Sequence, residues 1–108
     1  MAVDKKIQPG DTCPIEHALA LLGKKYTLLI LRDLQTGKKR FGELLKSVHG
    51  ISTKTLTERL EELEFAGLIT RKAYPVIPPK VEYTLTKKAK AVDPILDSFR
   101  AWGKKHSR

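Results

Sequence analysis

Apolar residues recur every three or four positions through most of the chain, which is the spacing of amphipathic helices. Pro14 suits the first position of a helix and would place Cys13 at its N-cap. One apolar stripe follows and is closed by Gly23; it consists of Ile15, Ala18, Leu19 and Leu22. A second helix is predicted to start at Thr27 and to stop at Gly37. Its apolar surface is too wide for a peripheral helix, so it should lie at the centre of the fold.

Two further helices are predicted to be separated by a short turn. The first has helical spacing at Phe41, Leu44, Leu45 and Val48. The turn comprises the three residues 49–51 and includes Gly50, after which Ser52 suits the N-cap of the next helix. The buried side of that helix would be formed by Leu56, Leu60 and Leu63. Residues 41–66 therefore predict a helix-turn-helix, in which the second helix is presented to the major groove of DNA.

After Gly67 the spacing becomes alternating, which is typical of strands. Val81, Tyr83 and Leu85 should face one way, and Glu82, Thr84 and Thr86 the other. Residues 68–74 are the expected antiparallel partner, joined to this strand by a proline-rich loop that is too long for a two-residue hairpin. A hairpin after a helix-turn-helix is a wing, assigned here to residues 68–86.

Helical spacing returns over residues 87–106, with Pro94 inside the segment. Either the helix kinks at Pro94, or Asp93 caps a new helix with Pro94 at its first position. The apolar stripe of this segment could belong to the core of the domain. We favour a dimer interface, because two-fold symmetry sets the spacing of DNA half-sites and a terminal helix can find its apolar partner on a second copy. The predicted interface consists of Ile15, Leu19, Ile95, Leu96, Phe99 and Trp102.

The length of 108 residues and a hydrophobic content of 41% fit one compact domain. Residues 1–12 are polar and aperiodic, so they are expected to form an N-terminal arm before a domain at residues 13–108. The predicted fold class is α+β and mainly α. It is a winged helix-turn-helix with a two-stranded wing and flanking N- and C-terminal dimerisation helices.

The chain is strongly basic, with 21 Lys and Arg against 12 Asp and Glu, a formal net charge of +9 and a pI near 9.8. This balance favours a polyanionic partner, either nucleic acid or an anionic membrane surface. No apolar run approaches the roughly 20 residues of a membrane span, and no signal peptide is recognisable, so a cytoplasmic protein without a membrane partner is expected.

Composition also argues against several kinds of site. The single cysteine excludes an intrachain disulfide, and the histidines at positions 17, 49 and 106 do not have metal-ligand spacing with it. No catalytic constellation and no phosphate-binding loop is recognisable. We therefore expect no metal, no cofactor and no enzymatic activity.

The first turn of the helix that begins at residue 52 is rich in hydroxyls, which can bond to phosphates and base edges. Thr53, Lys54 and Thr57 lie beyond the capping position and are predicted to face DNA. For Ser52 capping is the stronger interpretation, although a capping residue can also contact a phosphate. The acidic segment 58–64 is interpreted as the solvated side of the same helix.

Basic residues near the helix-turn-helix are candidates for phosphate contacts. Lys38, Lys39 and Arg40 come just before a helix, where positive charge opposes the macrodipole at a cost of a few tenths of a kcal/mol each. Such a cost favours an anionic partner, although a solvated loop is the simpler alternative. Lys80 at the edge of the wing is the first choice among the hairpin cations, and its alternative is ordinary protection of an edge strand.

Three segments together resemble the HxlR-type winged helix-turn-helix transcription regulators: CPIEHALALLGKKYTLLILRDL, KRFGELLKSVHGISTKTLTERLEELEFAGLI and YPVIPPKVEYTLT. The resemblance runs from Cys13 to about Gly103. It implies a homodimer on an inverted-repeat operator, with the recognition helix in the major groove, the wing on flanking backbone and terminal helices forming the dimer. One departure is Tyr26, where many relatives have tryptophan.

The resemblance also bears on Cys13, because some members of this family sense oxidants or electrophiles through the cysteine before the first helix. From composition alone a lone cysteine is more often an inert small side chain, so both interpretations stay open. With one cysteine per chain, a disulfide switch would have to be intermolecular. A small-molecule or oxidant signal is thus compatible with the sequence.

The leading hypothesis is a sequence-specific regulator that binds double-stranded DNA as a homodimer. The alternative is a winged-helix module for protein interaction or RNA association that uses the same basic face, because the fold alone does not decide between these functions.

Overall fold

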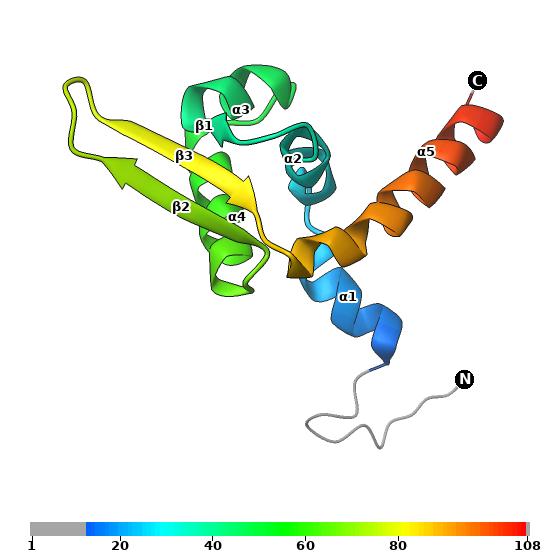
Figure 1. The fold of residues 1–108 in the computed structure, drawn as a ribbon. Helices are drawn as coiled ribbons and strands as arrows, with labels where there is room; N and C mark the ends of the chain where they lie inside the picture. The colour runs from blue at the N-terminus through cyan, green and yellow to red at the C-terminus, as the bar shows by residue number, and fades with distance from the viewer. Residues whose placement is uncertain (1–12, 108) are drawn as a thin grey trace.

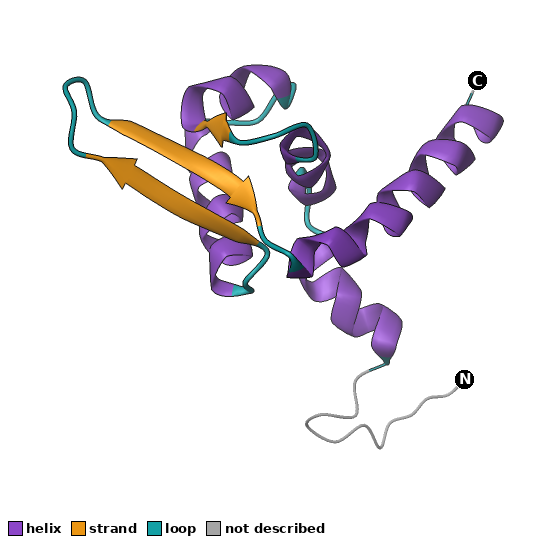
Figure 2. Cartoon of the chain, in the orientation of Figure 1, coloured by secondary structure: helices purple, strands orange, loops and turns teal. Residues whose placement is uncertain are grey.

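The computed structural model describes residues 13–107, so the predicted arm of residues 1–12 lies outside the described residues. Five α-helices, one 3₁₀ helix and three strands follow one another along these residues (Figures 1 and 2). The helices are α1 (Pro14–Leu22), α2 (Thr27–Leu34), α3 (Phe41–Ser47), α4 (Thr53–Phe65), η1 (Lys88–Val92) and α5 (Asp93–His106). The strands are β1 (Lys39–Arg40), β2 (Ile69–Tyr74) and β3 (Lys80–Leu85), arranged as an antiparallel sheet in the order β1-β3-β2. The mainly helical winged helix-turn-helix fold is confirmed.

Local capping explains why the helices begin and end where they do. Pro14 lies at the start of α1 with Cys13 as its N-cap, and Gly23 is its C-cap. Ser52 caps α4, its hydroxyl oxygen accepting a hydrogen bond of 3.1 Å from the backbone N–H of Thr55. Just past the end of α4, Gly67 has a φ of +81°, which a residue with a side chain rarely adopts. These boundaries were all predicted from the sequence.

The core lies where the helix-turn-helix meets the sheet. Its central helix is α2, whose Ile30, Leu31 and Leu34 are at most 2% exposed. Helices α3 and α4 contribute Leu44, Val48, Leu56, Leu60 and Leu63. The sheet covers this cluster with Ile69 and Tyr83. The central position expected for α2 is thus observed, and α4 is fixed with one side inward.

A third strand was missed by the sequence analysis. Lys39 and Arg40 form β1, in which they lie opposite Tyr83 and Glu82 of β3. Two charged residues show no apolar alternation, so only pairing with a strand more than 40 positions later defines this element. The wing is therefore the outer part of a three-stranded sheet rather than an isolated two-stranded hairpin.

The C-terminal segment contains a break at the predicted proline. The 3₁₀ helix η1 ends at Val92, and α5 begins at Asp93 with Pro94 in its first turn. A new helix therefore starts here, which is the second of the two alternatives, but its N-cap is Val92 rather than Asp93. The Asp93 carboxylate instead accepts a hydrogen bond of 2.8 Å from Gln35, the C-cap residue of α2. From this anchored base α5 extends away from the winged body, on the side where α1 also lies (Figure 1).

Candidate nucleic-acid interface

The first two turns of α4 expose the residues predicted to face DNA. Thr53, Lys54 and Thr57 are all exposed, whereas Leu56 and Leu60 on the opposite side are at most 2% exposed. Because the leucines are locked in the core, the direction of the polar side is fixed by packing. A helix held in this way can present the same atoms to each ligand it meets.

The hydroxyls on this surface are partly used within the helix. Ser52 caps the helix and also donates a hydrogen bond of 3.0 Å to the Thr55 hydroxyl. Thr57 donates its hydroxyl proton to the carbonyl oxygen of Thr53 at 2.9 Å, so its oxygen remains an acceptor. Within the part of the chain that the structure describes, the Lys54 ammonium has no hydrogen-bond or ion-pair partner. Lys54 is therefore a cationic donor on α4 that is available to a ligand.

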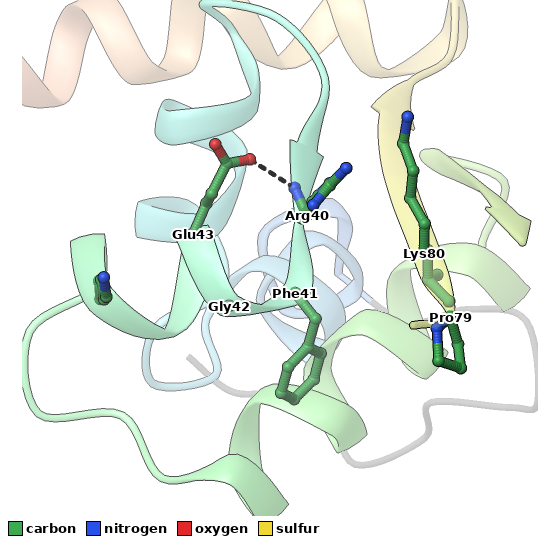
Figure 3. Close-up of a pocket in the computed structure, with 8 residues that line it drawn as sticks. Arg40, Phe41, Gly42, Glu43, Pro79 and Lys80 are labelled. Atoms are coloured by element: carbon green, nitrogen blue, oxygen red, sulfur yellow. Dashed lines mark hydrogen bonds between the residues drawn. The ribbon is translucent and has the colours of Figure 1, made fainter. Parts of the chain in front are cut away.

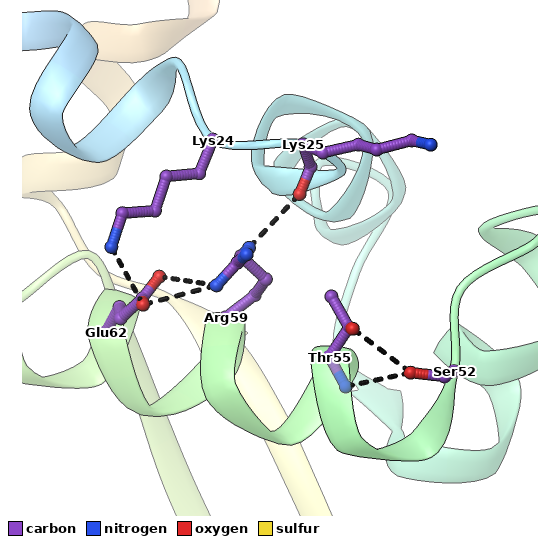
Figure 4. A network of polar contacts seen from close by, with 6 residues as sticks. All are labelled: Lys24, Lys25, Ser52, Thr55, Arg59 and Glu62. Atoms are coloured by element: carbon purple, nitrogen blue, oxygen red, sulfur yellow. Dashed lines mark hydrogen bonds and ion pairs between the residues drawn. The ribbon is translucent and has the colours of Figure 1, made fainter.

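The connection between α1 and α2 holds α4 at its middle (Figure 4). Arg59 donates from Nε to the carbonyl oxygen of Lys25 at 3.1 Å and pairs with Glu62 at 3.2 Å. Lys24 reaches the same Glu62 carboxylate at 3.0 Å. The interpretation of residues 58–64 as merely solvated was therefore wrong for Arg59 and Glu62. Their partners are distant in sequence, so helical periodicity alone could not identify them.

Tyr26 adds a second contact from the same connection. Its φ is +78°, unusual for a residue with a bulky side chain, and its hydroxyl donates to the carbonyl oxygen of Gly50 at 3.3 Å. Gly50 lies in the turn between α3 and α4. The connection therefore contacts both the turn and α4, and so fixes the orientation of α4 relative to the rest of the domain.

Of the three basic residues before α3, two have partners within the chain. Lys38 lies 3.6 Å from the Glu82 carboxylate, and Lys39 donates to the Thr36 hydroxyl at 2.8 Å. Arg40 is the N-cap of α3, and its backbone N–H donates to Glu43 Oε1 at 2.8 Å (Figure 3). Glu43 places negative charge in the first turn and so offsets part of the macrodipole cost expected for this cluster. Arg40 is exposed, and its guanidinium has no ion-pair partner among the described residues.

A groove brings the start of α3 beside the start of β3 (Figure 3). Its volume is about 460 Å³, and its walls include Arg40, Phe41, Lys46, Pro79 and Lys80. Two predicted phosphate-binding residues, Arg40 and Lys80, thus line one groove although 40 positions separate them. Lys46 joins them from α3, and its exposed place in the last turn of a short helix gave no distinctive sequence signal.

The predicted dimer residues divide into two groups. Ile15, Leu19, Ile95, Phe99 and Trp102 are between 38% and 68% exposed. Leu96, by contrast, is 6% exposed and belongs to the core of this chain. Leu29 of α2, which the sequence analysis did not single out, is 39% exposed. It lines a groove of about 500 Å³ together with Leu19, Ile95 and Phe99.

Cys13 is exposed, and its thiol makes no capping hydrogen bond to α1. Its backbone carbonyl accepts the first helical bond, from the N–H of His17 at 2.9 Å. The thiol therefore lies at the open end of α1, two positions before the exposed side chain of Ile15.

Comparison with known proteins gives consistent matches. Residues 21–108 match the family model described as HxlR-like helix-turn-helix. The chain is 45% identical over 100 residues to an uncharacterized HTH-type transcriptional regulator, sll1512 of Synechocystis sp., covering 93% of this chain and 74% of that protein.

Among the described residues, no helix is long and apolar enough to cross a membrane.

Two solved relatives are described in a stated redox form of the protein. The redox regulator HypR in its oxidized form matches with a TM-score of 0.83 and 35% identity, over 89% of this chain and 99% of that one. The reduced form of the transcriptional regulator YodB from B. subtilis matches with a TM-score of 0.75 and 40% identity, over 90% and 96% of the two chains. Both identities are high enough to compare more than the fold.

Proposed function

Because the chain belongs to the HxlR-like helix-turn-helix family of transcriptional regulators, we propose that it binds an inverted-repeat DNA operator as a homodimer with sequence specificity. The observation that carries the proposal is the exposed N-terminal part of α4, where Lys54 and two threonines project from a helix whose other side is locked in the core. A rigid helix with short polar side chains at its leading end can enter the major groove and reach base edges.

Each group of residues has a distinct proposed role. Lys54, Thr53 and Thr57 contact bases and nearby phosphates, and Ser52 combines capping with a phosphate contact. Residues that line or flank the groove between α3 and β3 contact the backbone: Lys38, Lys39, Arg40 and Lys80. This division follows the general pattern in which phosphate contacts position a protein and base contacts specify the sequence.

The dimer would form through α1, α2 and α5. Helices α1 and α5 lie on the side of the domain away from the wing (Figure 1), and they carry exposed apolar side chains from Ile15 to Trp102. A cluster of exposed apolar residues of this kind marks an interface. Burying it against a second copy would leave both recognition helices free for the two half-sites of an operator.

The direct test is selection from random duplexes followed by footprinting. We expect a palindromic site, with the logarithm of the affinity falling linearly as the logarithm of the salt concentration rises. Lys54→Ala should weaken operator binding about tenfold or more, since a good base or phosphate contact contributes about 1–3 kcal/mol. Lys90→Ala is the matched control, because Lys90 is also an exposed lysine but lies on η1.

The same experiment separates this proposal from a protein-binding or RNA-binding role. If the random duplexes yield no motif while RNA or an acidic protein forms a stable complex, the DNA proposal fails. If Lys54→Ala and Lys90→Ala reduce operator affinity equally, binding is generally electrostatic and α4 is not the reading element.

For Cys13 we propose an oxidant-sensitive role in the same regulator. The thiol is exposed at the end of α1, beside the proposed dimer surface, and the relatives HypR and YodB are named for redox states. Two Cys13 thiols from two chains would be oxidised to one disulfide, while diamide accepts the two electrons and two protons as it is reduced to the hydrazine. The disulfide would shift one protomer against the other and so change the distance between the recognition helices.

The test compares operator binding of the wild type and Cys13→Ser before and after diamide treatment. We expect a change in affinity and a dithiothreitol-reversible covalent dimer for the wild type alone. Equal responses of the two proteins would remove the sensory role and leave the DNA-binding proposal intact.

A further inference from the structure

The outer face of the sheet gathers basic side chains around one carboxylate. Residues that lie opposite each other in neighbouring strands point to the same face. Arg40 of β1 and Lys72 of β2 both lie opposite Glu82 of β3, and Tyr74 lies opposite Lys80. Since Lys80 and Glu82 are two positions apart, all five side chains share this face. Glu82 is the only acidic residue among them.

Glu82 is buried although it lies on the polar side of its strand. It is 9% exposed, and its carboxylate contacts one tyrosine and two lysines. The Tyr74 hydroxyl donates to Glu82 Oε1 at 2.9 Å. Lys38 lies 3.6 Å from Oε1 and Lys80 lies 3.5 Å from Oε2. One carboxylate therefore accepts a hydrogen bond from one hydroxyl and forms ion pairs with two ammonium groups.

The contacts of Glu82 differ in strength. The bond from Tyr74 has the length of a normal hydrogen bond, whereas both lysines are farther away than the 2.7–2.9 Å of a direct charge-assisted bond. The Lys38 side chain is 62% exposed and that of Lys80 is 32% exposed. A phosphate can therefore approach both ammonium groups while Tyr74 keeps the carboxylate satisfied.

Glu82 is ionised at neutral pH. The hydrogen bond from Tyr74 lowers its pKa, and although burial raises the pKa, the nearby charges of Lys38 and Lys80 lower it further. The carboxylate therefore carries its full negative charge under the conditions in which a regulator binds DNA.

We infer that Glu82 competes with phosphate for Lys38 and Lys80, and so limits the affinity of the basic sheet face for any polyanion. This inference rests on the proposed function in one respect, which is that the polyanion is DNA. In the free protein Glu82 partly neutralises the two lysines. When a phosphate binds them, the carboxylate loses its two ammonium partners, keeps the hydrogen bond from Tyr74 and repels the new charge. Sequence-independent binding is weakened, and the contacts of α4 then determine which DNA sequence the protein binds.

The competition has a measurable consequence in the salt dependence of binding. A lysine that is already paired with a carboxylate releases fewer counterions when it meets a phosphate. Replacing Glu82 by glutamine keeps an oxygen acceptor for Tyr74 and removes the charge. The logarithm of the affinity should then depend more steeply on the logarithm of salt, with a slope larger by about 0.9.

The experiment measures binding of wild type, Glu82→Gln and Glu16→Gln to a random-sequence duplex between 50 and 200 mM salt. Glu16 is exposed on α1, so its variant has the same change in net charge far from the sheet (Figure 1). Glu82→Gln should bind more tightly than both other proteins. Its advantage at 50 mM should be about threefold larger than at 200 mM, as the slope change requires. Equal slopes, or weaker binding by Glu82→Gln, would overturn the inference.

A second variant, Lys38→Gln, tests the inference from the side of the lysine. Lys38→Gln should reduce the salt slope less in the wild-type background than Lys54→Gln does, because only Lys38 is already neutralised. In the Glu82→Gln background the cost of Lys38→Gln should increase. Equal slope reductions by the two lysine variants would contradict the competition.

Retention on heparin separates this inference from the proposed function. If the wild type binds no duplex but Glu82→Gln is eluted from heparin at higher salt than Glu16→Gln, the DNA proposal fails and the role of Glu82 stands. If duplex binding is normal and heparin elution is the same for all three proteins, the DNA proposal stands and the role of Glu82 fails.

Discussion

Truncation of Trp102 tests the dimer most directly. Its side chain is 68% exposed in the single chain, and its aromatic contact within the chain is with His106, at 4.7 Å between ring centroids. A tryptophan can bury on the order of 250 Å², so roughly 170 Å² are free to be covered by a partner. At about 25 cal/mol per Å², this area corresponds to about 4 kcal/mol in each protomer. In a two-fold dimer the loss occurs twice.

Even if the interface covers only half of this area, the two protomers together lose about 4 kcal/mol, and at about 1.4 kcal/mol per factor of ten Trp102→Ala should raise the dissociation constant of the dimer about 1000-fold. Sedimentation equilibrium or light scattering over a concentration series measures this change. The melting temperature of the wild type should rise with protein concentration, and that of the variant should depend on it less. The fold of the single chain should persist, because truncating an exposed side chain costs little.

Phe65→Ala is the matched control, since Phe65 is 96% exposed at the end of α4, outside the proposed interface. This variant should remain dimeric. If Trp102→Ala has the same mass and the same dissociation constant as the wild type, the dimer does not use α5 and the proposed half-site geometry must be revised.

Two further predictions concern stability and the helix-turn-helix. Ser52→Ala removes the oxygen that accepts a hydrogen bond from the Thr55 N–H. Thermal unfolding should therefore show that the free energy of unfolding falls by about 1 kcal/mol. An unchanged melting temperature would mean that the cap contributes nothing. Burial raises the pKa of Asp33, but hydrogen bonds from Arg32 and Ser47 and the nearby positive charges outweigh it and lower the pKa below 3.8. Because the folded pKa is the lower one, Asp33 stabilises the fold above the unfolded value, and this contribution is lost as the pH falls through the folded pKa. Asp33→Asn should therefore flatten the acid limb of the stability curve measured by urea unfolding, and parallel curves for both proteins would exclude this role.

Much of the candidate DNA surface could be predicted because it depends on one helix. Burial of Leu56 and Leu60 fixes the rotation of α4, so the same spacing that identifies the core also identifies Thr53, Lys54 and Thr57 as exposed. The roles of Lys38 and Lys80 could not be predicted as fully. Their pairing with Glu82 depends on strands that meet only in the folded sheet.

The sequence by itself determined the elements and their ends, because helix periodicity, the Ser52 cap and the turn at Gly67 act over a few neighbouring residues. It also identified the apolar stripe of α5, but not which part of it is available to a partner. Tertiary structure decided that Leu96 enters the core while Phe99 and Trp102 stay exposed, since α5 leaves the body after its first turns.

Tertiary structure likewise created β1, the contact of Arg59 with the α1–α2 connection and the burial of Glu82. Each joins residues separated by more than 30 positions, or by a strand pairing that local spacing does not encode. A charged residue looks the same in sequence whether it is solvated or paired. Its partners, and therefore its electrostatic role, exist only once the chain has folded.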